Sequence, residues 1–253
     1  TWEDYRAVNV NGTMNVLAAA KRAGVRRVVH CSTVGVATEA TAPPYCERTP
    51  YSPQLDDKYE VTKCEAERAA LAYAGENAIS LSVIRPAQVY GPGDLGKVKF
   101  YKLVKKGVIV NPGRTNKHLI FIDDLCRSFM LAMTIPDAEG EVFLIADSKP
   151  TPLAHLVRIV ADTLGVAEPR IRLPAWPVVS ACSVIESISR LFKYKPPVHK
   201  RSMDFFTRSI ECRTDKARRL LGFESRISVE DGVRMTADWY RAKGMLMVLL
   251  ACM

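Results

Sequence analysis

The sequence predicts an α/β protein built around a parallel sheet. Three short apolar runs are typical of buried strands, namely Val25–Cys31, Leu81–Pro86 and Val142–Ala146. Segments long enough to form helices separate these runs, and strands that alternate with helices favour a parallel sheet whose faces the helices cover. With 253 residues, the chain can form one sizeable hydrophobic core and a smaller extension.

Helix signals fill the intervals between these runs. Helices are predicted at 3–22, 59–73, 98–105, 125–136, 151–164, 214–221 and 229–242, with a loop at 38–53. Gly24 follows the first helix, where a residue in the left-handed conformation commonly ends a helix. Asp123 or Asp124 is expected to cap the fourth helix, and Thr151 followed by Pro152 is expected to start the fifth.

Tyr59 and Lys63 are the most informative pair of residues. They stand four positions apart in a helical segment, so their side chains project from the same face. A free tyrosine has a pKa of about 10, and a nearby cation lowers that pKa toward the range of a general acid or base. The same spacing is common on helix surfaces, so the interpretation needs support from other residues.

Ser32 and Thr33 give that support. They directly follow the strand Val25–Cys31, and open parallel sheets bind ligands at the carboxyl ends of their strands. A hydroxyl there, with a tyrosine and a lysine, supplies the groups needed to move a proton on or off a secondary alcohol. Arg85, near the end of the second strand, is expected to form a structural ion pair.

Five motifs in a fixed order resemble the extended short-chain dehydrogenase/reductase superfamily, and within it the NAD-dependent epimerase/dehydratase family. The motifs are Val8–Leu17, Ser32-Thr33, Tyr59 with Lys63, Arg85-Pro86 with Val89–Asp94, and Ile122–Leu125. The resemblance implies an NAD(P)-binding Rossmann fold over residues 1–148. Residues 149–253 are expected to form a small substrate-binding region.

The resemblance also implies roles for single residues. Tyr59 is expected to accept the proton of the alcohol, and Lys63 to lower the pKa of Tyr59 and bind the nicotinamide ribose. Thr33, with Ser32 as the fallback, is expected to hold the substrate oxygen. Pro86 and Val89, together with Tyr59 and Lys63, are expected to meet the nicotinamide end of the cofactor, which is NAD or NADP.

The resemblance leaves one motif unmatched. The family begins with a strand and a glycine-rich turn that hold the pyrophosphate, and no residue before Val8 matches them. Gly91–Gly96 has the spacing G-x-G-x-x-G, but it follows Tyr59 and contains Pro92, so we interpret it as a loop. We therefore expect an N-terminally truncated enzyme or a fragment, which by itself binds NAD(P) negligibly.

Two positions narrow the substrate class. Dehydratases of this family carry Asp-Glu after the catalytic threonine, where this chain has Val34-Gly35, and epimerases typically carry an asparagine at the position of Gln88. Arg85-Pro86 is more similar to the hydroxysteroid dehydrogenase-like branch, and the apolar segment 173–191 favours an apolar, steroid-like substrate. We expect an oxidoreductase acting on a secondary alcohol or ketone. A nucleotide-sugar epimerase and an inactive fragment remain the alternatives.

The net charge of +9 is densest at residues 190–201. A solvated loop and a site for an anionic substrate or lipid headgroup are both kept, so a peripheral membrane contact stays open, as does a homodimer. Nucleic acid is not expected as a partner because no nucleic-acid-binding motif accompanies the charge. The apolar segments at 173–185 and 245–253 are too short to span a bilayer.

Cysteine and histidine usage bears on metals and on location. The seven cysteines are odd in number and include no C-x-x-C pair, which favours reduced thiols in a cytoplasmic protein. The four histidines are too dispersed to form a ligand cluster. No metal is therefore expected.

Overall fold

The computed structural model of the protein describes residues 1–111, 113–191 and 203–246. The chain forms two compact units, and it enters each of them three times. Unit 1 comprises Thr1–Val89, His118–Pro150 and Ile210–Arg226, and unit 2 comprises Tyr90–Lys117, Thr151–Ser209 and Ile227–Met253. The division expected between residues 148 and 149 concerns which ligand each part binds, and it stays a prediction.

A three-stranded parallel sheet forms the centre of unit 1. Its strands are β1 (Arg27–Cys31), β2 (Ser80–Pro86) and β7 (Val142–Ile145), in the order β1-β2-β7. Cys31 pairs with Ile84, and Pro86 pairs with Ile145, so the carboxyl ends of all three strands lie along one edge. The sequence-based prediction of these strands is confirmed, with boundaries that differ by one or two residues.

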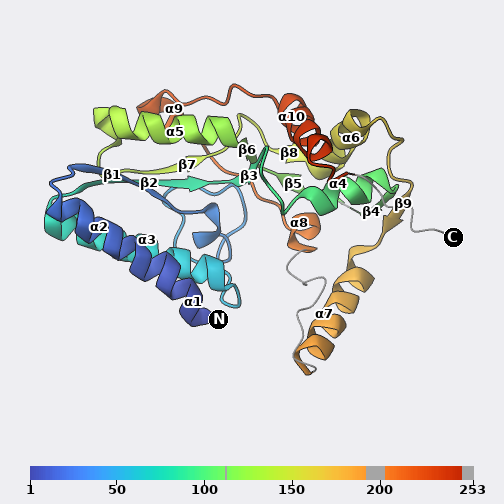
Figure 1. Cartoon of the computed structure of the whole chain (residues 1–253), viewed down its shortest axis with the longest axis horizontal. Helices are drawn as coiled ribbons and strands as arrows, with labels where there is room; N and C mark the ends of the chain where they lie inside the picture. The colour runs from blue at the N-terminus through green and yellow to red at the C-terminus, as the bar shows by residue number, and fades with distance from the viewer. Residues whose placement is uncertain (112, 192–202, 247–253) are drawn as a thin grey trace. The chain divides into compact units, whose positions relative to one another are not determined.

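Helices cover both faces of this sheet (Figure 1). Helices α2 (Gly12–Arg22) and α3 (Lys58–Asn77) lie on one face, and α5 (Ile122–Thr134) and α9 (Asp215–Leu221) lie on the other. One apolar cluster joins residues of α2, α3 and β2, and a second joins residues of β2, β7, α5 and α9. Each fully buried Leu, Ile or Phe in these clusters contributes about 1.5–3 kcal/mol of transfer free energy.

Helix α3 is the long helix that carries Tyr59 and Lys63. Its N-cap is Asp57, whose carboxylate accepts hydrogen bonds from two backbone amides of the first turn. Small side chains on its buried face, including Ala66, Ala70 and Ala74, let it approach the sheet closely. It ends where Ala78 adopts the left-handed conformation, with φ of 52°.

The remaining elements are short. In unit 1, the helix α1 (Trp2–Arg6) continues through a π-helical turn, Ala7–Asn11, into α2, and 3-10 turns occur at Val34–Val36 and Pro136–Ala138. Strand β3 (Gln88–Tyr90) pairs with β6 (Leu119–Phe121).

Unit 2 contains two small sheets and five helices within the described residues. Strand β4 (Val108–Val110) pairs with β9 (Ile171–Leu173), and β5 (Asn116–Lys117) pairs with β8 (Thr151–Pro152). The helices are α4 (Val98–Lys105), α6 (Leu153–Leu164), α7 (Ala175–Leu191), α8 (Asp204–Thr207) and α10 (Val229–Ala242).

Two predicted helix caps are wrong. Phe121 is the N-cap residue of α5, and neither Asp123 nor Asp124 caps it with a side chain; the Asp124 carboxylate instead binds Arg127 and the backbone of Arg226. Thr151 belongs to β8, so α6 starts at Leu153. In both cases backbone pairing or a tertiary partner replaces the local capping interaction.

Other predictions need smaller corrections. The helix predicted at 3–22 is interrupted by the π-helical turn, and α3 extends to Asn77 rather than ending near residue 73. The apolar segment beyond residue 173 is largely a helix, α7. Most of the basic run 190–201 and of the apolar tail 245–253 lies outside the described residues.

Candidate active site

The candidate site lies where β1 and β2 end. The backbone amide of Ser32 donates a hydrogen bond of 2.8 Å to the carbonyl oxygen of Ile84, so the chain stays beside β2 after β1 ends. Thr33 then begins a 3-10 turn, and its hydroxyl accepts a hydrogen bond of 3.2 Å from the Gly35 amide. The strand end thus holds Ser32 buried and Thr33 half-buried at the edge of the sheet.

The first turns of α3 bring the other two groups to this edge. The Asp57 carboxylate accepts hydrogen bonds of 2.7 Å and 3.2 Å from the amides of Tyr59 and Glu60, which fixes the start of the helix. One turn later, the Lys63 ammonium donates a hydrogen bond to the carbonyl oxygen of Cys31, the last residue of β1. The Tyr59–Lys63 face of α3 therefore lies at the carboxyl end of β1.

The two hydroxyls at the strand end have different surroundings. Ser32 is 1% exposed, and its hydroxyl donates a hydrogen bond to the buried carboxylate of Glu67. Thr33 is the more accessible of the two. This geometry supports Thr33 over the fallback Ser32 as the group that meets a ligand.

Glu67 joins Ser32 to a buried ion pair. The Arg85 guanidinium donates to Glu67 at 2.6 Å and 3.0 Å, and the Tyr51 hydroxyl donates to it at 2.8 Å. The guanidinium also lies 4.9 Å from the centre of the Tyr51 ring. The structural ion pair expected for Arg85 is confirmed, and through Ser32 it holds the end of β1.

The expected lowering of the Tyr59 pKa is not found. Partial burial raises the pKa of the Tyr59 phenol above its usual value, and the Cys31 thiol and Glu60 act in the same direction. Burial also lowers the pKa of the Lys63 ammonium, against the opposing influence of Cys31 and Glu67. At neutral pH the phenol is therefore protonated and able to donate a proton.

Pro86 and Val89 follow each other closely in the chain near this edge, but they belong to two different strands. Pro86 is the last residue of β2, beside Ile145 of β7. Val89 lies in β3 and packs against the apolar cluster of the sheet. The Lys63 ammonium is a donor that suits the hydroxyls of a nicotinamide ribose, so this edge offers a group that fits that end of the cofactor.

Sequence reasoning missed Asp57, Glu67 and Tyr51. The signal for Asp57 was present, because aspartate directly before an apolar helix is a common N-cap. The signal for Glu67 was its spacing of four residues from Lys63, which puts it on the same helix face. Tyr51 comes from a loop, and no local pattern predicts its contact.

Comparison with known proteins identifies the family. Residues 1–175 match the 3-beta hydroxysteroid dehydrogenase/isomerase family. The chain belongs to this family. The predicted membership of the extended short-chain dehydrogenase/reductase superfamily is therefore confirmed, and the 3-beta hydroxysteroid dehydrogenase/isomerase family consists of NAD(P)-dependent enzymes.

Two curated relatives of this family member differ in the reaction that their names state. The 3 beta-hydroxysteroid dehydrogenase/Delta 5-->4-isomerase of Mycobacterium tuberculosis is 33% identical over 68% of this chain and 50% of its own length. The UDP-glucose 4-epimerase of Vibrio cholerae is 27% identical over 92% of this chain and 69% of its own length.

Solved structures agree with the fold. The alignment with the crystal structure of gox2253 covers 98% of this chain and 76% of the gox2253 chain, with a TM-score of 0.77 and 25% identity. The alignment with MoeE5 in complex with UDP-glucuronic acid and NAD covers 93% of this chain and 71% of the MoeE5 chain, with a TM-score of 0.69 and 24% identity. The predicted α/β fold of the Rossmann type is confirmed.

One further finding concerns membranes. None of the helices in the described parts of the chain combines the length and the apolar character that crossing a bilayer requires.

Proposed function

We propose that Tyr59, Lys63 and Thr33 perform the proton transfer in the NAD(P)-dependent oxidation of a secondary alcohol and in the reverse reduction. The observation that carries this proposal is the hydrogen bond from the Lys63 ammonium to the Cys31 carbonyl oxygen. That contact puts the Tyr59–Lys63 face of α3 beside the strand end that leads into Thr33. Family membership supplies the enzyme class, NAD(P)-dependent dehydrogenases and epimerases.

The roles follow from the chemistry of the carbinol. The bound nicotinamide takes up the hydride in oxidation and returns it in reduction. Tyr59 donates its proton to the carbonyl oxygen during reduction and accepts it during oxidation. Thr33 holds the same oxygen by a hydrogen bond, and Lys63 binds the ribose and favours the phenolate when the substrate has displaced water.

The direction of the Tyr59 pKa shift suits reduction at neutral pH. A phenol with a raised pKa stays protonated, so it can act as the acid that ketone reduction needs. Alcohol oxidation needs the phenolate, so its rate should rise with pH up to the pKa of Tyr59.

The substrate proposed is apolar and steroid-like. Dehydration is disfavoured, because Val34-Gly35 carries no acid, and a Cβ built on Gly35 would lie 2.7 Å from the Glu60 side chain. Unit 2 exposes large apolar side chains of β9 and α7, including Ile171, Trp176 and Val184, which suit an apolar ligand. A similar relative bears the name hydroxysteroid dehydrogenase.

Sugar epimerisation is the second candidate. It is favoured by the Vibrio cholerae relative named UDP-glucose 4-epimerase, which aligns with 92% of this chain.

The proposal has four further parts, each with its own test. They are the use of NADP, a cytoplasmic location, a homodimer and a peripheral membrane contact.

The protein for this test is expressed from its natural gene. Incubation with NAD⁺ and a hydroxysteroid should release free NADH, measured by absorbance, whereas an epimerase returns its hydride to the product and accumulates no NADH. Tyr59→Phe should lower kcat by about 10²–10⁴-fold and leave the Kd for NAD⁺ nearly unchanged, because only the proton shuttle is lost. Tyr73→Phe, on the same helix, is the matched control.

Two results would overturn this proposal. Near-normal turnover by the Tyr59→Phe enzyme would remove Tyr59 from the mechanism. Conversion of a UDP-sugar to its epimer without accumulation of NADH would establish the second candidate instead.

A further inference from the structure

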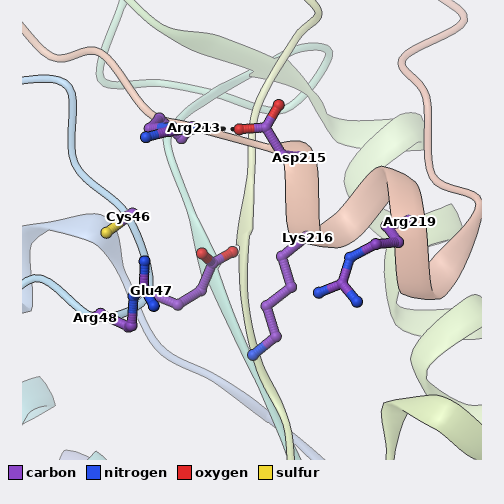
Figure 2. A pocket seen from close by; sticks show the side chains of 7 residues that line it. All are labelled: Cys46, Glu47, Arg48, Arg213, Asp215, Lys216 and Arg219. Carbon is purple, nitrogen blue, oxygen red and sulfur yellow. Dashed lines mark hydrogen bonds and ion pairs between the residues drawn. The ribbon is translucent and has the colours of Figure 1, made fainter.

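A charged pocket lies in unit 1, between the loop that carries Cys46 and helix α9. Its volume is about 260 Å³, and it is lined by Cys46, Glu47, Arg48, Arg213, Asp215, Lys216 and Arg219. Figure 2 shows the side chains of residues 46–48 on one side of it and those from α9 on the other. Four of the seven lining residues are cationic and two are acidic.

The position of this pocket separates it from the site of Tyr59. Glu47 accepts a hydrogen bond of 3.0 Å from the amide of Leu144, and Lys216 donates one of 2.7 Å to the carbonyl oxygen of Val142. Both contacts are with β7, whereas the Lys63 contact and Thr33 lie at the end of β1, the opposite edge strand of the sheet. The backbone carbonyl of Glu47 also accepts a hydrogen bond of 3.4 Å from Arg85 of β2, the strand between them. Val142 is moreover the first residue of β7, so Lys216 lies toward the amino end of that strand.

Two of the four cations are already neutralised. Arg213 forms an ion pair of 3.2 Å with Asp215, and Lys216 forms one of 2.6 Å with Glu141. The Glu47 carboxylate accepts a hydrogen bond from the Leu144 amide, and within the described residues it forms no ion pair with the pocket cations.

Arg48 and Arg219 differ from the other two cations. Within the described residues, neither guanidinium has a carboxylate partner, and both side chains are exposed. They come from opposite walls of the pocket, Arg48 from the loop and Arg219 from α9. Two arginines and one carboxylate leave an excess of one positive charge in a hollow of molecular size.

We propose that this pocket binds the phosphate group of a small ligand. A guanidinium offers paired N–H donors that match two oxygens of a phosphate, and two guanidiniums on facing walls suit a dianion better than a monovalent ion. The carboxylate of Glu47 limits the affinity, because it repels the same anion.

Cys46 provides a native reporter of binding. Partial burial would raise the pKa of its thiol, but hydrogen bonds from the Thr49 hydroxyl and from the Arg48 and Thr49 backbone lower it. Alkylation at Cys46 can therefore be followed by mass spectrometry. Cys126 is exposed on α5 and outside the pocket, and it serves as the internal control.

The experiment measures how fast Cys46 reacts with iodoacetamide, which is neutral, in the whole protein. Inorganic phosphate and phenyl phosphate are added in separate arms, and sodium chloride of equal ionic strength is the reference. Both phosphates should slow the reaction of Cys46 and leave Cys126 unchanged. Protection by phenyl phosphate alone would assign the site to organic phosphates, and protection by inorganic phosphate alone would assign it to the free ion.

Variants separate specific binding from general charge. Arg48→Gln or Arg219→Gln should weaken the phosphate affinity about fivefold, the effect of one unpaired charge at about 4 Å in a water-like medium. Arg218→Gln is the matched control, because Arg218 is exposed on the same helix but pairs with Glu224 at 3.2 Å.

Glu47→Gln gives a test by gain of binding. Glutamine retains an acceptor for the Leu144 amide and removes the repelling charge, so phosphate should bind about fivefold more tightly. A misfolded variant cannot produce that result. Equal protection of Cys46 and Cys126, no protection of Cys46, or no gain in Glu47→Gln would each overturn the proposal, and none of these outcomes bears on Tyr59.

Discussion

In unit 1, the region beside β1 and β2 and the region after β7 each bury a carboxyl group, but only the first region supplies it with hydrogen-bond donors from the described residues. Beside β1 and β2, Glu67 is fully buried and accepts hydrogen bonds from Ser32, Tyr51 and Arg85. After β7, Asp147 is 4% exposed, and neither of its carboxyl oxygens has a hydrogen-bond partner among the described residues.

The pKa values follow this difference. Burial would raise the pKa of Glu67, but the hydrogen bonds and charge of Arg85, with Ser32 and Tyr51, hold it below the usual value. Burial, helped by the nearby Asp124, raises the pKa of Asp147 to about 7. Burial alone thus does not decide whether a carboxyl is charged; its donors do. The region with the donors is the one that carries the candidate active site.

The largest expected effect is at Glu67. Glu67→Gln leaves the Arg85 guanidinium buried without a counter-charge, and breaking a buried pair in this way costs about 3–5 kcal/mol of unfolding free energy. Urea denaturation at pH 7 measures it. The double variant Glu67→Gln with Arg85→Met should recover part of the loss, because it removes the stranded charge as well.

The pH dependence of this cost has a definite sign. Since the pKa of Glu67 is lowered on folding, its stabilisation is present above the unfolded value of 4.5 and is lost as the pH falls through the folded value. The cost of Glu67→Gln should therefore shrink in acid. A cost below about 1 kcal/mol at pH 7 would contradict the importance given to the buried pair.

The second effect is at Asp147 and has the opposite sign. Its pKa rises from 3.8 to about 7 on folding, so its ionisation destabilises the protein increasingly between those pH values, by about 1.4 kcal/mol per pH unit. Asp147→Asn cannot ionise, so its stability relative to the natural protein should increase from pH 4 to pH 7. Thermal unfolding across this range measures the change.

Asp123→Asn provides the control for that measurement. Asp123 is exposed on the first turn of α5, next to Asp124. Its substitution should change stability little, because its side chain is exposed. A flat difference for Asp147→Asn would mean that Asp147 is solvated or paired in solution.

The smallest effect is expected at a neutral buried group. Ser82 is fully buried in β2, and its hydroxyl donates a hydrogen bond of 2.5 Å to the Ala138 carbonyl oxygen. Ser82→Ala should cost about 1 kcal/mol, the net value of one neutral hydrogen bond. Urea denaturation should show no pH dependence for this cost. A cost equal to that of Glu67→Gln would show that charge is not what distinguishes the two sites.

Sequence reasoning identified the groups whose signals are local. The strand that ends in Ser32-Thr33 and the four-residue spacing of Tyr59 and Lys63 were both readable, because apolar runs and helical periodicity depend on neighbouring residues. The family resemblance, carried by the same residues, is confirmed by the match over residues 1–175. Whether these residues catalyse a reaction stays a proposal.

The features that the sequence did not predict depend on distant partners. Glu67 meets Arg85 and Tyr51 only after three segments have packed, so no local pattern indicates which polar residue becomes buried. The same holds for Asp124, where an amide of Arg226 competes with the helix cap. The direction of the Tyr59 pKa shift was also missed, because it is set mainly by burial.

The π-helical turn at Ala7–Asn11 has a consequence for comparing related chains. Such a turn accommodates one residue more than an α-helical turn, so it acts as a single-residue insertion absorbed without breaking the helix. Removing that residue would rotate everything on its amino-terminal side by about 100° around the helix axis. The ion pair of 2.8 Å between Arg6 and Glu65 on α3 would then be lost. A one-residue gap here in a homologous sequence would therefore mark a different helix face turned toward α3.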